Sequence, residues 1–142
     1  MDPIANLLAL EAIRALKARY FRCVDLKDWD GLAKVFAADI AFDRTFGMAV
    51  QNPWTGQWTP PIADAPVIVR GREAVIEMVR AAIAHVRTVH QGFMSEIEVE
   101  SADTARGIWA MRDEIYDRAG RLIVRGSGHY HETYERLPSG GV

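Results

Sequence analysis

Two expected helices meet in the stretch YFRCVDLKDWD, residues 20–30. Upstream of it, apolar residues recur at steps of three and four, which predicts an amphipathic helix over residues 3–26. Charged residues such as Lys17 are expected to occupy the positions between the apolar ones. Asp28 is of a type that caps helix N-termini, so a second, short helix is expected to begin there. The stretch therefore sets a tyrosine and a carboxylate among apolar residues where one helix ends and another begins.

The pattern of residues from position 39 onward predicts antiparallel strands. Apolar and polar residues alternate over residues 39–46, which indicates a half-buried strand. A helix over about residues 72–85 precedes three longer strands, expected over residues 86–99, 104–116 and 122–134. Helices that come first and antiparallel strands that follow favour an α+β fold, with the helices packed on one face of a strongly bent sheet.

Size and composition limit the kind of protein. The chain has 142 residues, of which 49% are hydrophobic and 25% charged, so we expect one domain over residues 1–142. The net charge is -2 and no long Lys/Arg cluster occurs, so nucleic acid is not an expected partner. No apolar run reaches the ~18 residues of a membrane span. The single cysteine, Cys23, excludes an internal disulfide and fits a reducing cytoplasm, so a cytoplasmic protein is expected.

Residues 47–66 differ from the rest of the chain. They hold four prolines and two tryptophans, Trp54 and Trp58, and show no periodicity. A loop of this length in a compact domain is usually functional or disordered, and large apolar rings normally find something to cover. Two roles stay open, namely an arm that contacts another copy of the chain and a lid over a pocket.

His90 and Asp113 are polar residues on strands that otherwise carry apolar rows. Asp113 ends a row that includes Trp109 and Met111, so it needs a partner if it is buried. The alternative is that the row emerges into solvent at Asp113. A carboxylate hydrogen-bonded to one imidazole nitrogen fixes the tautomer and makes the other nitrogen a better base. Asp25, at the end of the first helix, is the natural partner for His90.

Tyr20 could donate a hydrogen bond to a substrate oxygen that gains negative charge. It lies about 140° round an ideal helix from Asp25, so the two side chains converge only if the helix ends, tightens or bends between them. The alternatives are a core tyrosine and a solvated aspartate.

His129 and His131 share a face of the last strand, and such a pair can bind a metal. No third ligand stands at a suitable spacing, so no metal site is expected.

At these residues the sequence resembles a known family. Residues 16–30, residues 87–90 with 105–109, and residues 130–136 are similar to the first helix, the histidine strand with its neighbour, and the late strand of SnoaL-like proteins. These belong to the superfamily of nuclear transport factor two, scytalone dehydratase and ketosteroid isomerase. The bacterial bile-acid dehydratases are especially similar. The resemblance implies a cone, in which a curved mixed sheet wraps round a pocket and is closed by helices, and it implies a homodimer or homotrimer.

The resemblance also implies a site without metal or organic cofactor. Asp25 and His90 match the dyad of the family, and Tyr20 and Asp113 match the other two polar residues of the bile-acid dehydratases. The apolar side chains nearby favour a flat hydrophobic substrate that is steroid-, polyketide- or aromatic-derived. The residues expected to contact it are Phe93, Trp109, Met111, Trp54, Trp58 and His131.

The resulting hypothesis is a cofactor-independent dehydratase or isomerase. A binding or assembly module on the same fold and a polyketide cyclase are the alternatives, because a fold does not fix a function. The sequence departs from the family in three places. Val24 stands where scytalone dehydratase has a tyrosine, which argues against scytalone-type chemistry. The loop at residues 47–66 is longer than in the bile-acid enzymes, and the expected final strand is missing after Gly141.

Overall fold

The structure is a computed structural model that describes residues 2–138. The first half holds two helices and two short strand pairs. The helices are α1 (Pro3–Leu26) and α2 (Trp29–Ala33), and the strands are β1 (Ala41–Asp43), β2 (Val50–Gln51), β3 (Trp58–Thr59) and β4 (Ile68–Arg70). Strand β1 pairs with β4 and β2 pairs with β3, both antiparallel.

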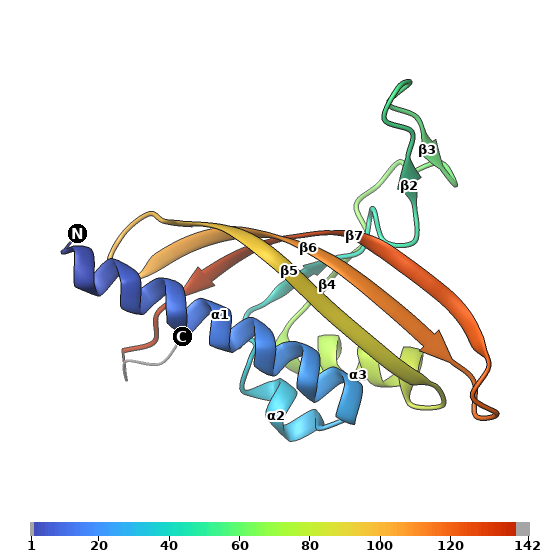
Figure 1. Cartoon of the computed structure of the whole chain (residues 1–142), viewed down its shortest axis with the longest axis horizontal. Helices are drawn as coiled ribbons and strands as arrows, with labels where there is room; N and C mark the ends of the chain where they lie inside the picture. Colours follow the sequence, from blue (N-terminus) through green and yellow to red (C-terminus); the bar gives the residue numbers. More distant parts are fainter. Residues whose placement is uncertain (1, 139–142) are drawn as a thin grey trace.

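The second half of the chain forms one curved sheet. Its elements are α3 (Arg72–Ile83), β5 (Arg87–Val99), β6 (Thr104–Tyr116) and β7 (Leu122–Glu135). The three long strands pair in the order β5-β6-β7, and α1 crosses one face of this sheet, called here the inner face (Figure 1). The expected α+β fold with a curved sheet is confirmed. The strand pairs of the described residues are all antiparallel, whereas the resemblance implied a mixed sheet.

Both ends of α1 are capped. The Asp2 carboxylate accepts a hydrogen bond from the Ala5 N–H at 3.1 Å, and Pro3 occupies the first turn. Lys27 turns left-handed with a φ of 58° and ends the helix. Asp28 then caps α2 by accepting from the Gly31 N–H at 2.9 Å. The first expected strand is shorter than predicted, because Asp43 accepts the Thr45 N–H at 2.8 Å and turns the chain.

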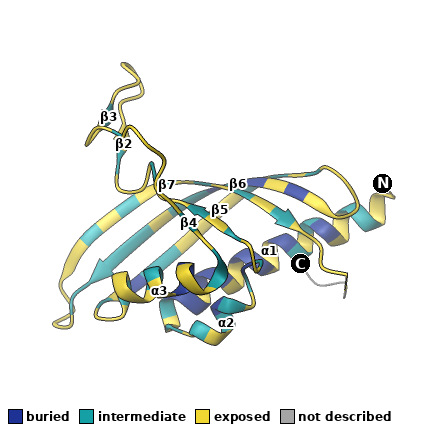
Figure 2. Cartoon of the chain, turned by 180° about the vertical axis from the view of Figure 1, so that it is seen from behind, coloured by how far each residue is buried: buried dark blue, intermediate teal, exposed yellow. Residues whose placement is uncertain are grey.

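One side of α1 is buried against the sheet and against helices α2 and α3, as Figure 2 shows in dark blue. Its members are Ala9, Ile13, Leu16, Lys17, Tyr20, Phe21, Cys23 and Val24. The position of Lys17 corrects the expectation that it lies outside the apolar stripe. It follows Ile13 by four residues and precedes Tyr20 by three, so it lies on their face of the helix. Its side chain is only 4% exposed and forms an ion pair with Glu132 of β7.

Helix α1 approaches β5 closely at a glycine. A Cβ at Gly92 would lie 2.5 Å from Cε2 of Phe21, so a larger residue there would push the helix away. The ring of Phe21 stacks on the imidazole of His90, with centroids 6.0 Å apart and planes 15° apart. The β5–β6 register shifts between Gly92 and Ser95, which marks a bulge beside this contact. The end of α1 is therefore held over the strand that carries His90.

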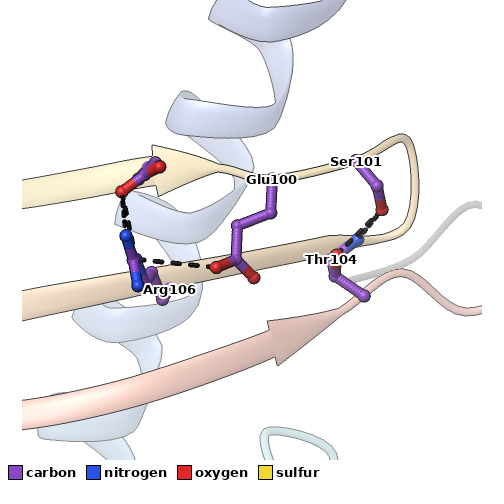
Figure 3. A network of polar contacts seen from close by, with 5 residues as sticks. Glu100, Ser101, Thr104 and Arg106 are labelled. Atoms are coloured by element: carbon purple, nitrogen blue, oxygen red, sulfur yellow. Dashed lines mark hydrogen bonds and ion pairs between the residues drawn. The ribbon is translucent and has the colours of Figure 1, made fainter.

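The turn between β5 and β6 is built from local polar contacts (Figure 3). The Ser101 hydroxyl lies 2.8 Å from that of Thr104 and also accepts the Thr104 N–H at 3.0 Å. Beside the turn, Arg106 pairs with Glu98 at 2.6 Å and with Glu100 at 3.5 Å. These charges are exposed, so the pairs contribute little stability, but Glu98 and Arg106 are direct partners in the strand register.

Helix α3 starts at a glycine that its backbone requires. Gly71 has a φ of 89°, which side chains other than hydrogen rarely tolerate. Val75 and Ile76 bury the inner stripe of the helix in the core shared with the end of α1. The Arg72 guanidinium donates to the Phe36 carbonyl at 2.9 Å and ties α3 to the segment after α2.

Residues 47–66 form an arm that stands away from the sheet and the helices (Figure 1). The tip is ordered by Asn52, whose side-chain oxygen accepts the N–H groups of Trp54 at 2.9 Å and of Thr55 at 3.1 Å. Trp54 is 89% exposed. Of the two roles left open by the sequence, this position favours the arm over the lid.

Two further expectations concern the chain as a whole. No helix within residues 2–138 combines the length and the apolar character needed to cross a membrane. The end of the chain, where the resemblance indicates that a final strand is missing after Gly141, lies outside the described residues.

Candidate active site

Asp25 and His90 meet where the end of α1 packs against β5. One carboxylate oxygen of Asp25 accepts from the Thr88 hydroxyl at 2.9 Å and lies 2.6 Å from Nδ1 of His90. The other oxygen accepts the His90 backbone N–H at 2.9 Å. An ionised carboxylate only accepts hydrogen bonds, so Nδ1 carries a proton, and in the neutral ring Nε2 keeps its lone pair. The structure thus builds a dyad whose free nitrogen can act as a base.

Helix and strand periodicity explain why these side chains meet. Asp25 follows Phe21 by four residues, so both point from the same side of α1. Thr88 and His90 are two residues apart on β5 and point to the inner face. The Asp25 side chain is 23% exposed and that of His90 is 11% exposed, so the pair is largely removed from bulk water.

The protonation of Asp25 follows from its surroundings. Burial raises the pKa of the carboxyl, but hydrogen bonds from His90 and Thr88 outweigh it and hold the pKa below its usual range. Asp25 is therefore ionised at neutral pH, as an orienting partner for the imidazole must be.

Asp113 lies directly across the sheet from His90. The two residues are partners in the β5–β6 register, a position in which side chains on one face come into contact range. On the next strand Gly126 is the partner of Asp113, and a Cβ there would collide with the carboxylate. Asp113 is half-buried on the inner face, so its row does not simply emerge into solvent. The glycine makes the room that Asp113 needs.

Tyr20 is a buried core residue beside the dyad, and α1 continues past it without a break. The helix stays regular to Leu26, and the ring of Tyr20 packs edge-on against Tyr130 of β7, with centroids 6.0 Å apart. The helix does not end or bend between positions 20 and 25, so the two side chains do not converge: Asp25 faces β5 and Tyr20 faces β7. Burial raises the pKa of Tyr20 to about 12, partly opposed by the Tyr130 hydroxyl. The phenol stays protonated at neutral pH and can donate.

An open area lies on the inner face between Asp113 and Tyr130. Met111 is paired there with Gly128, and a Cβ on Gly128 would meet no heavy atom within 4 Å. This area is where a ligand could reach both polar ends of the site. Trp109, next in the row, is buried instead, and its indole N–H donates to the Tyr134 hydroxyl at 2.8 Å.

The other expected substrate contacts lie away from the dyad. Phe93 follows the inward-facing Gly92, so it points to the outer face and is 52% exposed. His131 is also exposed, because successive strand residues alternate between faces and Tyr130 points to the inner face. Trp54 and Trp58 belong to the projecting arm, where Trp58 packs on Phe46 at 5.0 Å. These positions correct the expectation that all four residues line one site with His90.

Sequence reasoning missed a second polar group on the inner face. Lys17 and Glu132 form a buried ion pair, and the Tyr134 hydroxyl donates to Glu132 at 2.5 Å. Tyr130 lies beside them, with its ring centroid 3.5 Å from the Lys17 ammonium. Strand alternation places Tyr130, Glu132 and Tyr134 on one face with Gly126 and Gly128, and this signal is present in the sequence.

The site coincides neither with a metal-binding cluster nor with the cavity beside the β6–β7 turn. Within residues 2–138, no three side chains of His, Cys, Asp or Glu are grouped to hold a metal ion. A cavity of about 390 Å³ opens between residues 84–87 and the β6–β7 turn, and neither Asp25 nor His90 lines it. The candidate site is therefore the inner face itself, with the dyad at one side and the tyrosines at the other.

Comparisons with known proteins agree with this architecture. Residues 5–141 match the family model described as SnoaL-like domain. A variant of Rv3472, a Mycobacterium tuberculosis protein of unknown function, has a TM-score of 0.68 at 26% identity, over 93% of this chain and 69% of that one. The hexachlorocyclohexane dehydrochlorinase LinA type 2 has a TM-score of 0.70 at 18% identity, with 96% and 81% covered. A candidate scytalone dehydratase from Novosphingobium aromaticivorans has a TM-score of 0.69 at 17% identity, with 96% and 79% covered.

The hydrogen bonds to Asp25 predict a pH-dependent contribution to stability. The pKa of Asp25 is lower in the folded state than in the unfolded state, where it is about 3.9. The hydrogen bonds therefore stabilise the fold fully above the unfolded-state pKa, and this stabilisation is lost as the pH falls through the folded-state pKa. Urea unfolding of wild type and Asp25→Asn should therefore differ most above about pH 4 and converge in stronger acid. Asp39→Asn, at an exposed aspartate, is the matched control. A difference for Asp25→Asn that stays constant from pH 7 to pH 3 would contradict this interpretation.

Proposed function

This chain belongs to the SnoaL-like domain family, and we propose that it is a cofactor-independent dehydratase or isomerase of a small hydrophobic carbonyl compound. The observation that carries the proposal is the 2.6 Å contact of Asp25 with Nδ1 of His90, which leaves Nε2 free as a base. Two structural relatives are described as a dehydrochlorinase and a candidate scytalone dehydratase. Both names denote eliminations, which need a base of this kind.

The proposed reaction starts with proton removal. Nε2 of His90 takes a proton from the carbon next to the carbonyl, and Asp25 stabilises the resulting imidazolium. The electron pair of the broken C–H bond forms an enolate, whose oxygen accepts a hydrogen bond from Tyr20. When the C–O bond to the leaving hydroxyl breaks, the proton is returned to it from His90, or from Asp113 after relay, and water leaves. In an isomerase the same proton returns to another carbon.

The inner face supports a flat, apolar substrate. Met111 and the open area over Gly128 lie between Asp113 and the tyrosines, so a ring placed there would have polar groups at two of its edges. Steroid-, polyketide- and aromatic-derived compounds fit this description. Ring closure by a polyketide cyclase would use the same groups on a different substrate.

The arm supports a proposal about assembly. Trp54 is held at the arm's tip by Asn52 yet is 89% exposed, and Met48 on the same arm is 83% exposed. Apolar rings fixed in solvent are typical of surfaces that a partner covers. We propose that the partner is a second copy of this chain, in a homodimer or homotrimer. A purely assembling module is the alternative function that this feature favours.

Replacing Trp54 tests the assembly proposal. Trp54→Ser should lower the molar mass measured by light scattering at a fixed concentration toward that of the monomer, because the anchoring ring is lost. Leu8→Ser, at an exposed apolar residue of α1, should leave the mass unchanged. The proposal is wrong if wild type is monomeric, or if Trp54→Ser keeps the wild-type mass.

Removing the base tests the proposed reaction. His90→Ala should lower kcat by about 10²–10⁴-fold on a β-hydroxy ketone that the wild type dehydrates, with the conjugated product followed by ultraviolet absorbance. His129→Ala removes an exposed imidazole from the outer face of β7 and should keep the wild-type rate. Turnover by His90→Ala at the wild-type rate would refute the mechanism.

A further inference from the structure

Lys17 is the buried charge that the reaction above leaves unused. Its ammonium is enclosed between α1 and β7, where it pairs with Glu132. Lysines are almost never fully buried without a partner, since removing the charge from water is costly. Burial lowers the pKa of Lys17, and the Glu132 carboxylate opposes that shift. Burying an ion pair often adds little to the stability of a fold. The burial of Lys17 with Glu132 therefore needs another explanation.

The ammonium lies against the rings that face the site. It is 3.5 Å from the ring centroid of Tyr130, 4.5 Å from that of Tyr20 and 5.0 Å from that of Phe21. A cation over an aromatic face is attracted to the ring and helps to fix its orientation. Burial raises the pKa of both phenols, and the Glu132 carboxylate adds to the shift, so both stay protonated and can donate. Lys17 therefore acts on Tyr20 and Tyr130 together.

The pair is anchored from behind. Glu132 accepts from the Tyr134 hydroxyl at 2.5 Å, and that hydroxyl accepts from the Trp109 indole N–H at 2.8 Å. This chain of contacts joins β6 and β7 and fixes the carboxylate that holds Lys17. The lysine side chain, at 4% exposure, is not available to a substrate itself.

Open space borders Tyr130 on the inner face. Gly128 precedes Tyr130 by two residues on the inner face and has open space above it. A ring lying beside Met111 would bring an oxygen substituent toward Tyr20 and Tyr130. Along β7, Tyr130 therefore lies between Glu132 of the charged pair and the open area over Gly128.

We propose that Lys17 is a positioning residue whose buried ammonium, held by Glu132, fixes Tyr20 and Tyr130 as a pair of phenol donors for the substrate's carbonyl oxygen. The inference rests on the proposed function for its substrate and adds Tyr130 as a catalytic residue of the same site. Its ligand class is a neutral carbonyl compound whose oxygen gains negative charge.

Two probe molecules distinguish hydrogen bonding to the ligand's oxygen from apolar contact with its rings. 2-Naphthol carries an oxygen on a flat apolar ring system, and naphthalene has the rings alone. The double variant Lys17→Met/Glu132→Gln removes both charges and leaves neither one buried without a partner. Circular dichroism establishes that it is folded. Arg14→Met, which removes an exposed cation from the same helix, is the matched control.

The expected result is a selective loss. The double variant should bind 2-naphthol about tenfold more weakly by fluorescence titration, while naphthalene binding changes less than about twofold, because only the donors are displaced. Arg14→Met should change neither. If the two probes weaken equally, or if neither weakens, Lys17 is only a packing element and the proposal is overturned.

A second variant covers the case in which the double variant does not fold. Tyr130→Phe removes one hydroxyl and should weaken 2-naphthol binding but not naphthalene binding, as Tyr20→Phe should. Unchanged 2-naphthol binding by Tyr130→Phe overturns the proposal. Because binding needs no turnover, these results stand apart from the proposed reaction, which fails separately if His90→Ala keeps its activity.

Discussion

The Asp25 carboxylate, held by three donors from β5, is the contact on which the rest of the site depends. It joins the last turn of α1 to the sheet and fixes both the position and the tautomer of His90. Burying a carboxylate is costly, and hydrogen bonds to a charged group, at about 1.5–3 kcal/mol each, offset that cost. Gly92 makes the contact sterically possible by letting Phe21 approach the strand. One side chain thus couples helix packing to chemistry.

Strand register distributes the remaining groups. His90 and Asp113 are direct partners across β5 and β6, and Trp109 and Tyr130 are direct partners across β6 and β7. Between these rows lies the pairing of Met111 with a glycine, which leaves the inner face open. The result is a base at one side, phenols at the other and an apolar floor between them. That arrangement suits removal of a proton from a carbon beside a carbonyl.

Periodicity predicted the long elements well, because α1 and the three long strands each follow one period over many residues. Residue types also singled out Asp25 and His90, which the structure brings into contact. Lys17 was predicted to lie outside the apolar stripe because it is charged, although its spacing from Ile13 and Tyr20 places it within that stripe. His131 was expected at the site from its residue type, but it alternates with Tyr130 along β7 and so lies on the outer face. The arm at residues 47–66 has no period, so its projection away from the sheet could not be predicted.

The nitrogen chemistry of His90 is the most direct measure of the central claim. ¹⁵N NMR of the labelled protein, at a pH where the ring is neutral, distinguishes a protonated Nδ1 from a protonated Nε2. The Asp25 contact predicts that the proton resides on Nδ1 and that Nε2 is unprotonated, with this preference lost in Asp25→Asn. A neutral ring protonated on Nε2 in the wild type would contradict the claim, because the nitrogen assigned as the base would hold no free lone pair.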